Sequence, residues 1–320
     1  MPVLFISSLS SHKIINQTLI DMNKRILVIG SSNTDMTIKG ERLPIPGETI
    51  TGGIFYMGPG GKGANQAVAA KRLGGDVEFI CKVGNDMFGD NALEGYRKEG
   101  MDISHVMRSK EASGTALILV DESGENCISV ASGANGDITP ADIDSVADVI
   151  RSAGFLILQL EIPVKSVLRA ARIAHKAGVY VILNPAPACE LPKEIFKYIS
   201  LMTPNRSEAS IMSGCDVTDE ASLEKAVEVL KGYGVQDFVV TLGSKGSLVF
   251  KDGKAEMIPS LKVNAVDATA AGDTFCGALC VALSEGLSLQ DAARFATKAS
   301  AITVQRMGAQ ASIPTRDEIK

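Results

Sequence analysis

The stretch Asp267-Ala-Thr-Ala-Ala-Gly-Asp-Thr-Phe-Cys-Gly-Ala278 places small residues and two aspartates directly before an apolar run. The apolar run predicts a buried helix, and residues 261–266 lean toward a strand. The first N–H groups of a helix lack partners and carry partial positive charge, so they attract anions. The small residues at 270–272 leave room for an anion there. Asp273 could take a proton from an attacking hydroxyl or only charge the first helical turn, and this stretch leaves both open.

The composition narrows the possible functions. The 320 residues are 45% hydrophobic and 22% charged, which is ordinary for a globular protein. A net charge of −5 and 5% aromatics without Trp argue against nucleic acid or an anionic membrane surface as a partner. Six scattered cysteines and no secretory signal predict reduced thiols and a cytoplasmic location. No segment is apolar enough to predict a membrane span.

Two sequence features lie outside this pattern. Residues 1–21 are rich in Ser and precede a clear strand, so we expect an N-terminal extension outside the fold, with Met22 as the natural start. Deleting the extension should leave activity intact. Cys276 and Cys280 would share a helix face, where buried small side chains are favoured over a metal pair.

From Arg25 onward, short runs of Ile, Leu and Val alternate with segments of helical periodicity. This alternation predicts an α/β fold, a three-layer αβα sandwich with a mostly parallel central sheet. Ligands in such sheets bind beyond the carboxyl ends of the strands. The expected strands are 25–30, 77–83, 155–160, 179–183, 201–203 and 238–242, and helical spacing is clear at 167–174, 223–230 and 289–296.

Two stretches interrupt the alternation. Residues 34–57 combine prolines with short extended pieces, and residues 115–130 resemble a hairpin around Asp121-Glu-Ser-Gly124. Both differ in pattern from the helix-covered sheet. We therefore expect them to form a small β-sheet lid over a site.

The first glycine-rich stretch, Gly58–Ala67, is not a Walker A motif. Gly63 follows Lys62 where that motif needs Ser or Thr, and the stretch also lacks a dinucleotide fingerprint. Four glycines in six residues carry an entropic cost that a plain turn would not require. We expect a loop that presents Lys62 and Asn65 to a polyol and enters a helix near Ala64.

Polar residues follow two of the expected strands. Asn33 and Asp35 suit vicinal hydroxyls, although the same residues are common in turns. Glu161 ends the strand at 155–160, where it either binds a ligand or is solvated.

Two further loops leave alternatives open. Asn205 and Glu208 could face a metal or phosphate, or could form a reciprocal helix cap. The segment Thr241-Leu-Gly-Ser-Lys-Gly246 is either a hairpin turn or a nucleotide contact.

Together, Gly60-Gly-Lys-Gly-Ala-Asn-Gln-Ala67 and Asp267-Ala-Thr-Ala-Ala-Gly-Asp273 are similar to the two signatures of the ribokinase-like (PfkB) sugar kinases. They lie in the same order as in that family, and the resemblance extends from Met22 to the end of the chain. The shorter matching motifs are Gly30-Ser-Ser-Asn-Thr-Asp35, Pro46-Gly-Glu-Thr49, Asn184-Pro-Ala-Pro187, Asn205-Arg-Ser-Glu208 and Gly308-Ala-Gln310. The resemblance implies one kinase domain at 22–320 that carries the β lid.

The resemblance also implies an activity, which is transfer of the ATP γ-phosphate to the 5-hydroxyl of D-ribose. Asp273 would be the general base, and the backbone N–H groups of Ala270, Ala271 and Gly272 would form an anion hole with it. Mg²⁺ would accompany ATP, K⁺ would activate, and the lid would join a homodimer. The alternatives are a family kinase for fructose, 2-keto-3-deoxygluconate or a nucleoside, and a sugar-binding regulator without catalysis.

The binding residues implied by the resemblance fall into three groups. The sugar would contact Asn33, Asp35, Gly61, Lys62, Asn65 and Glu161. ATP would contact Asn205, Thr241, Gly243, Ser244, Gly246, Gly272 and Thr297. Glu208 would hold Mg²⁺ through water, and K⁺ would lie among Asp267, Thr269, Thr303, Arg306, Gly308 and Ser312. Two positions depart from the family pattern: Ala268 stands where Thr is usual, and Thr297 where Asn often lies near adenine.

Overall fold

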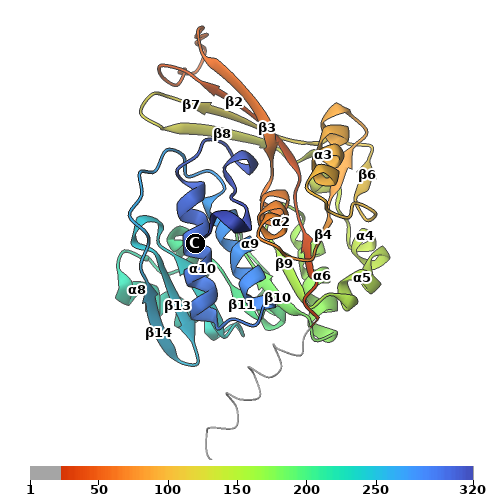
Figure 1. Ribbon diagram of the computed structural model, residues 1–320, viewed down its shortest axis with the longest axis vertical. Helices are drawn as coiled ribbons and strands as arrows, with labels where there is room; N and C mark the ends of the chain where they lie inside the picture. Colours follow the sequence, from red (N-terminus) through yellow and green to blue (C-terminus); the bar gives the residue numbers. More distant parts are fainter. Residues whose placement is uncertain (1–22, 320) are drawn as a thin grey trace, which may run out of the picture.

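The structure is a computed structural model that describes residues 23–319, so the expected extension at 1–21 lies outside the described residues. Its central sheet has eight strands in the order β14-β13-β12-β11-β10-β9-β1-β4 (Figure 1). In this order, the six strands from β12 to β4 are parallel to one another, and β13 and β14 add an antiparallel edge. The strands are β1 (Ile26–Ile29), β4 (Val77–Ile80), β9 (Phe155–Leu158), β10 (Tyr180–Leu183), β11 (Leu201–Met202), β12 (Asp237–Thr241), β13 (Ser247–Lys251) and β14 (Lys254–Ile258).

Both faces of this sheet are buried because its strands are apolar throughout. All four residues of β1 are buried, and they alternate between two core clusters: Ile26 and Val28 belong to one, Leu27 and Ile29 to the other. The first cluster includes residues of α2 (Lys62–Arg72), α3 (Met87–Lys98), α9 (Ala271–Ser284) and α10 (Leu289–Thr303). The second includes residues of α4 (Pro140–Ser145), α5 (Ala147–Ser152), α6 (Val164–Lys176), α7 (Arg206–Ser213) and α8 (Glu220–Lys231). The predicted three-layer sandwich is confirmed.

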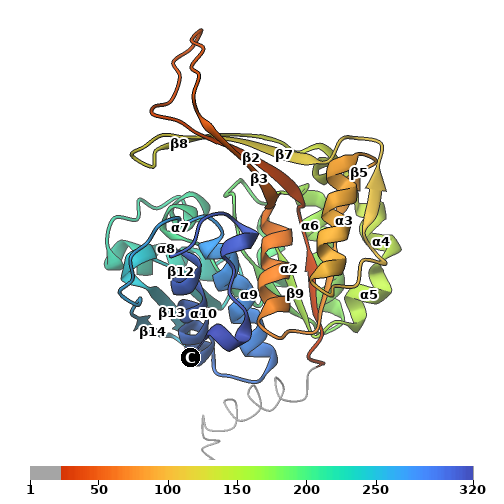
Figure 2. The ribbon, with the colours of Figure 1, turned by 45° about the horizontal axis from the view of Figure 1, so that its top comes forward.

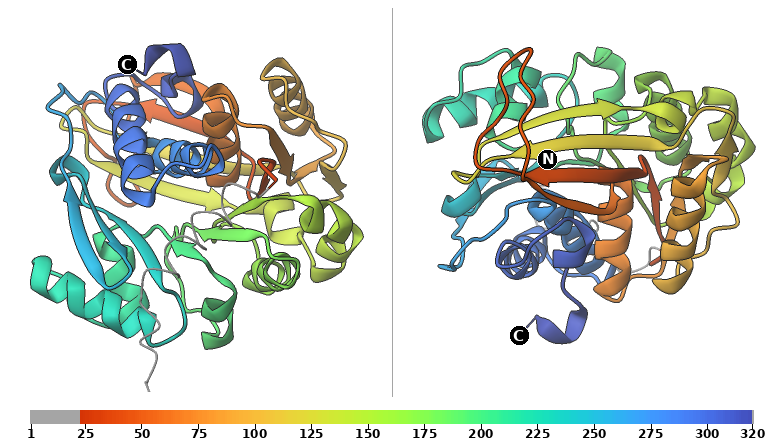
Figure 3. Two further views of the ribbon diagram at one scale, coloured as in Figure 1. Left: turned by 60° about the horizontal axis from the view of Figure 1, so that its bottom comes forward. Right: turned by 90° about the horizontal axis from the view of Figure 1, so that it is seen from above.

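A second sheet lies over the carboxyl end of the central strands (Figures 2 and 3). Its strand order is β3-β2-β7-β8, and we call it the lid. The lid strands are β2 (Asn33–Lys39), β3 (Ile54–Gly60), β7 (Gly114–Val120) and β8 (Asn126–Ala131). Because β2 starts only four residues after β1 ends, the lid leaves the body directly above the sheet edge.

The remaining elements are short. Strands β5 (Lys82–Gly84) and β6 (Met107–Ser109) pair with each other. The 3-10 turns are η1 (Gly133–Asp137), η2 (Lys193–Tyr198), η3 (Gly243–Lys245), η4 (Gln310–Ser312) and η5 (Arg316–Glu318). Within residues 23–319, none of the helices has the length and apolar content needed to cross a membrane.

Several expected elements differ in the structure. The strand expected at 77–83 is broken at Cys81, because β5 leaves the central sheet to pair with β6. The segment 261–266 is not a strand: its apolar side chains are exposed, Val266 at 60%. Helix α2 begins at Lys62, two residues before the expected start. Helix α3 and the β13–β14 edge had no counterpart among the expected elements.

Candidate active site

A cavity of about 400 Å³ lies between the lid and the carboxyl edge of the central sheet. Thirteen of its lining residues were assigned a site role from the sequence, and Ala268 lies among them: Asn33, Asp35, Gly61, Lys62, Asn65, Glu161, Asn205, Glu208, Thr241, Thr269, Ala270, Gly272 and Asp273. The lid closes the cavity with Ala116, Ile118, Ile128 and Val130. The fold therefore brings most of the expected sugar, nucleotide and catalytic residues into one space.

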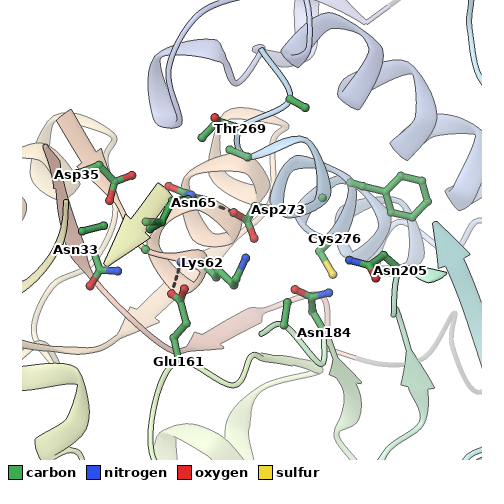
Figure 4. Close-up of a pocket in the computed structure, with 18 of the residues that line it drawn as sticks. Asn33, Asp35, Lys62, Asn65, Glu161, Asn184, Asn205, Thr269, Asp273 and Cys276 are labelled. Atoms are coloured by element: carbon green, nitrogen blue, oxygen red, sulfur yellow. Dashed lines mark hydrogen bonds between the residues drawn. The ribbon is translucent and has the colours of Figure 1, made fainter. Parts of the chain in front are cut away.

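Asp273 occupies the third position of α9 and does not cap that helix. The N-cap is Ala270, which makes no side-chain cap and has a left-handed φ of 59°. Asp273 is only 7% exposed, and each of its oxygens accepts one amide N–H: Asn65 Nδ2 to Oδ2 and Gln66 Nε2 to Oδ1, both at 3.0 Å. Figure 4 shows the carboxylate beside Asn65 in the middle of the cavity. Asp273 thus lies in the first turn of α9, as one interpretation expected, and also lines the cavity, as a base would need to.

The start of α9 is shaped for an anion. A positive φ is uncommon for alanine, and such strained positions cluster at functional sites. A Cβ added at Gly272 would meet no protein atom within 4 Å, so protein packing does not require glycine there. The free space lies where helical N–H groups have no intrahelical acceptor. The N–H of Ala271 is already engaged by the carbonyl of Ala268 at 3.2 Å, which leaves those of Gly272 and Asp273 as donors for a ligand.

Asn33 and Asp35 lie on strand β2, so the turn interpretation of these residues was wrong. Their strand neighbour is equally constrained, because a Cβ at Gly60 would come within 2.1 Å of the Asp35 carboxylate. Burial raises the pKa of Asp35 to about 6, and the negative charges of Glu161 and Asp273 add to this. The nearby positive charge of Lys62 therefore does not offset the effects of burial and negative neighbours on the pKa of Asp35.

This raised pKa predicts a stability effect for Asp35→Asn. The folded state binds the Asp35 proton more tightly than the unfolded state, so this carboxyl destabilises the fold increasingly as pH rises from about 4 to about 6. We expect Asp35→Asn to be more stable than wild type above pH 6, by on the order of 1–2 kcal/mol after solvent screening. The difference should vanish below pH 4. Urea unfolding at pH 4 and pH 7.5 measures it, and an equal difference at both values would contradict the assignment.

Glu161 and the start of α2 hold each other in place. One Glu161 oxygen accepts the backbone N–H of Lys62 at 2.9 Å and the Ser31 hydroxyl at 2.5 Å. Gly61 precedes the helix with φ 89°, and a Cβ there would lie 2.7 Å from the Asn33 nitrogen. Burial opposes the charge of Lys62, but surrounding carboxylates, led by Asp273, raise its pKa overall. Glu161 is thus bound into the site and is not a solvated strand end.

Asn205 and Glu208 confirm the cap interpretation, while a metal or phosphate contact for them stays a prediction. They form a reciprocal cap of α7, with each side chain accepting the other's backbone N–H at 2.8 Å. Both also line the cavity. Burial raises the pKa of Glu208, partly offset by the hydrogen bond from the Asn205 backbone. The cap holds the carboxylate in a fixed orientation at the cavity wall.

Four expected nucleotide contacts are absent from the lining of this cavity. Gly243 and Ser244 lie in the turn η3, followed by Gly246, just after the lining residue Thr241. Thr297 is buried in α10, where its hydroxyl bonds the Ala293 carbonyl at 2.8 Å. The turn can still meet a nucleotide that extends out of the cavity past Thr241. Thr297 offers such a ligand no free hydroxyl proton.

The residues expected around K⁺ come from the loop before α9 and from the end of α10 with the segment that follows it. Asp267 accepts the N–H groups of Thr269 at 2.8 Å and Gly308 at 2.9 Å, and its own N–H reaches the Val304 carbonyl at 3.2 Å. The other members are more occupied within the protein. Thr303 bonds the Thr274 hydroxyl, Ser312 bonds the Ala309 carbonyl, and the Arg306 guanidinium pairs with Glu318. Arg306 could offer a cation only its carbonyl.

Several lining or supporting residues had no role assigned from the sequence. Gln66 and Asn184 lie behind Asp273 and stand inside motifs that were quoted for recognition. Cys276 lines the cavity and contacts the Thr203 hydroxyl at 3.0 Å. Burial raises the pKa of the Cys276 thiol to about 12, so it is a small neutral wall. Within residues 23–319, no cluster of three or more His, Cys, Asp or Glu side chains could hold a metal.

Known proteins match the chain over almost its whole described length. Residues 23–316 match the pfkB family of carbohydrate kinases, and the chain belongs to that family. The chain is 44% identical to the ribokinase of Haemophilus influenzae over 298 residues, which cover 93% of this chain and 97% of the relative. The motif-based resemblance is confirmed, and so is the expectation of a kinase.

Solved structures agree with this placement. A crystal structure of ribokinase from Thermotoga maritima is 39% identical with a TM-score of 0.85, covering 93% of this chain and 98% of that one. The structure of Arabidopsis thaliana ribokinase complexed with ribose and ATP is 34% identical with a TM-score of 0.86, with the same coverage of both chains.

Proposed function

We propose that this chain transfers the γ-phosphoryl group of ATP to the 5-hydroxyl of D-ribose, giving ribose 5-phosphate and ADP. One observation carries the proposal. A buried carboxylate, Asp273, shares a cavity with polar side chains suited to a sugar and with helix N–H groups that have no acceptor within the described part of the protein. The relatives named ribokinase, and the one complexed with ribose and ATP, support ribose as the acceptor.

The sugar is held by the polar residues on the lid side of the cavity. Asp35 and Glu161 accept hydrogen bonds from sugar hydroxyls, Lys62 donates, and Asn33 and Asn65 can donate or accept around the ring. The apolar lid residues Ala116, Ile118, Ile128 and Val130 cover the sugar and exclude water. Exclusion of water matters because phosphoryl transfer to water would waste ATP.

Transfer then needs one proton acceptor and charge stabilisation. Asp273 takes the proton of the sugar 5-hydroxyl while the hydroxyl oxygen forms a bond to the γ-phosphorus of ATP. The bond between that phosphorus and the oxygen bridging it to the β-phosphorus breaks, and ADP leaves. The N–H groups of Gly272 and Asp273 face the charge on the transferred group. The free space beside Gly272, where an added Cβ would meet no protein atom within 4 Å, supports this placement of the transferred group.

Mg²⁺ accompanies ATP in this proposal, where it would neutralise phosphate charge. Glu208 lines the cavity from α7 beside Asn205, and one carboxylate with water and phosphates is a usual Mg²⁺ environment. K⁺ fits the loop around Asp267, whose partners there are neutral N–H and O–H groups. Asn205 and Thr241, with the turn Gly243–Lys245, receive the rest of ATP.

The lid also supports a homodimer. By strand alternation and register, the face turned away from Asp35 carries Ile38, Phe55, Met57 and Leu117, which are 45–58% exposed. A contiguous apolar face of this kind suits burial against a second lid. Sedimentation velocity of the full chain should give the mass of a dimer, and a monomer at micromolar concentration would refute this part.

The function is tested by coupling ADP release to a panel of acceptors, which are D-ribose, 2-deoxyribose, fructose, 2-keto-3-deoxygluconate and adenosine, with and without Mg²⁺ and K⁺. We expect the highest kcat/KM on ribose, no turnover without Mg²⁺, and activation by K⁺. A higher kcat/KM on another acceptor would replace ribose with that sugar or nucleoside. Ribose binding by calorimetry without any ADP release would support the non-catalytic regulator instead.

A further inference from the structure

Three buried amide side chains lie directly behind the Asp273 carboxylate. Gln159 follows β9, Gln66 is on α2, and Asn184 follows β10, so the chain of amides spans three elements. Gln159 and Gln66 are fully buried, and Asn184 is 8% exposed. Gln66 and Gln159 are absent from the cavity lining, so they do not meet a sugar or a nucleotide there. Burying polar amides is costly unless they are hydrogen-bonded, which raises the question of what they do.

The Gln66 amide is fully used, and its orientation is fixed by its neighbours. Its oxygen accepts Gln159 Nε2 at 2.6 Å, and its two N–H groups reach Asn184 Oδ1 and Asp273 Oδ1, both at 3.0 Å. Asn184 in turn donates to the Thr203 carbonyl at 2.9 Å, which leaves its oxygen for Gln66. A flipped Gln66 would turn its oxygen toward the Asn184 and Asp273 oxygens and lose both of those bonds. The neighbours therefore ensure that Gln66 presents an N–H to Asp273.

The N–H that Gln66 donates to Asp273 lies beside a cavity with several negative charges. Four carboxylates, those of Asp35, Glu161, Glu208 and Asp273, line the same space, and Lys62 is the lysine among them. Crowded negative charge of this kind disfavours ionised carboxylates. Amide N–H groups donate to both oxygens of one of these carboxylates, Asp273. They also fix its rotamer, since both oxygens are tied to α2.

We infer that Gln66 is a positioning residue for phosphoryl transfer, which holds the Asp273 carboxylate aimed at the acceptor hydroxyl, with Asn184 fixing the orientation of Gln66. The inference rests on the proposed role of Asp273 as base. It assigns Gln66 an effect on kcat without an effect on sugar or nucleotide binding, because Gln66 touches neither.

The test compares Gln66→Met and Gln66→Glu with wild type. Gln66→Met keeps the length of the side chain but removes the N–H, and it should lower kcat about 10- to 100-fold. The KM values for ribose and ATP, and the Kd for ribose by calorimetry, should stay within about 3-fold. Gln66→Glu places a second carboxylate against Asp273, and a proton shared between the two would block the base. The acidic limb of its kcat profile should therefore move to higher pH.

Gln159→Met serves as the matched second variant, since it leaves Gln66 in place and removes only the hydrogen bond to the Gln66 oxygen. It should show the same pattern with a smaller loss of kcat. A wild-type kcat in Gln66→Met, or equal losses in kcat and ribose binding with an unmoved pH profile in Gln66→Glu, would overturn the inference. Asp273→Asn belongs in the same series: if it is as active as wild type, the proposed base fails, whereas an inactive Asp273→Asn beside an unaffected Gln66→Met rejects only the role of Gln66.

Discussion

Asp273→Asn is expected to lower kcat for sugar phosphorylation by about 10²–10⁴-fold. Asparagine keeps the size of the side chain but cannot accept the hydroxyl proton at neutral pH. The loss should be confined to kcat, because the sugar contacts proposed for Asp35 and Glu161 are untouched. Steady-state kinetics with ribose and ATP, together with ribose calorimetry, separate the two effects.

This substitution also disturbs the hydrogen bonds around position 273. Both oxygens of Asp273 accept N–H groups, from Asn65 and Gln66. An amide at this position would set its own NH₂ against one of those donors, at a stability cost of about 1–3 kcal/mol. Thermal unfolding must therefore accompany the kinetics. Asp148→Asn is a suitable control, because Asp148 is 99% exposed on α5 and should change neither property. A kcat within about 3-fold of wild type in Asp273→Asn would mean that this carboxylate is not the base.

The central sheet was predictable because the apolar sequence of each strand indicates that the strand is buried on both faces. A run such as β1, apolar at every position, fits only a strand covered on both faces. The same logic failed at residues 261–266, where Leu261, Val263 and Val266 are exposed, because composition alone does not say what covers a segment. It also failed at Cys81, where an apolar run continues in sequence but changes partner from one sheet to another.

The candidate site was predictable to the extent that its chemistry is local. Asp273 and the small residues before it form one motif, so their meaning could be inferred without the fold. The amides behind Asp273 are different, because Gln66 is 93 residues from Gln159 and 118 from Asn184. Only the adjacency of β9 and β10 in the sheet, with α2 packed over it, brings them together. Asn33 and Asp35 were ambiguous for the same reason: a turn and a lid strand differ in their distant partners.

Gly277→Ala is expected to lower both stability and activity. Helices α2 and α9 pack closely at Gly277, one turn after Asp273. An added Cβ would lie 2.7 Å from the Gln66 carbonyl oxygen, 2.8 Å from the Ala69 Cβ and 2.9 Å from the Ala70 nitrogen. Two of these three are backbone atoms, so the helices must separate. We expect a loss of about 1–3 kcal/mol in the free energy of unfolding. Asp273 would move away from Asn65 and Gln66, and a displacement of about 1 Å costs about 10²-fold in kcat.

Gly272→Ala is the matched control, since it adds the same methyl group to the same helix. Its Cβ would meet no protein atom within 4 Å, so stability should be unchanged or rise by up to about 1 kcal/mol from helix propensity. Its activity should nevertheless fall, because the methyl group occupies the space proposed for the transferred phosphoryl group. Urea unfolding and kinetics on both variants test the two roles separately. Unchanged stability in Gly277→Ala would show that α2 and α9 tolerate separation. Full activity in Gly272→Ala would contradict the proposal that the transferred phosphoryl group binds at the start of α9.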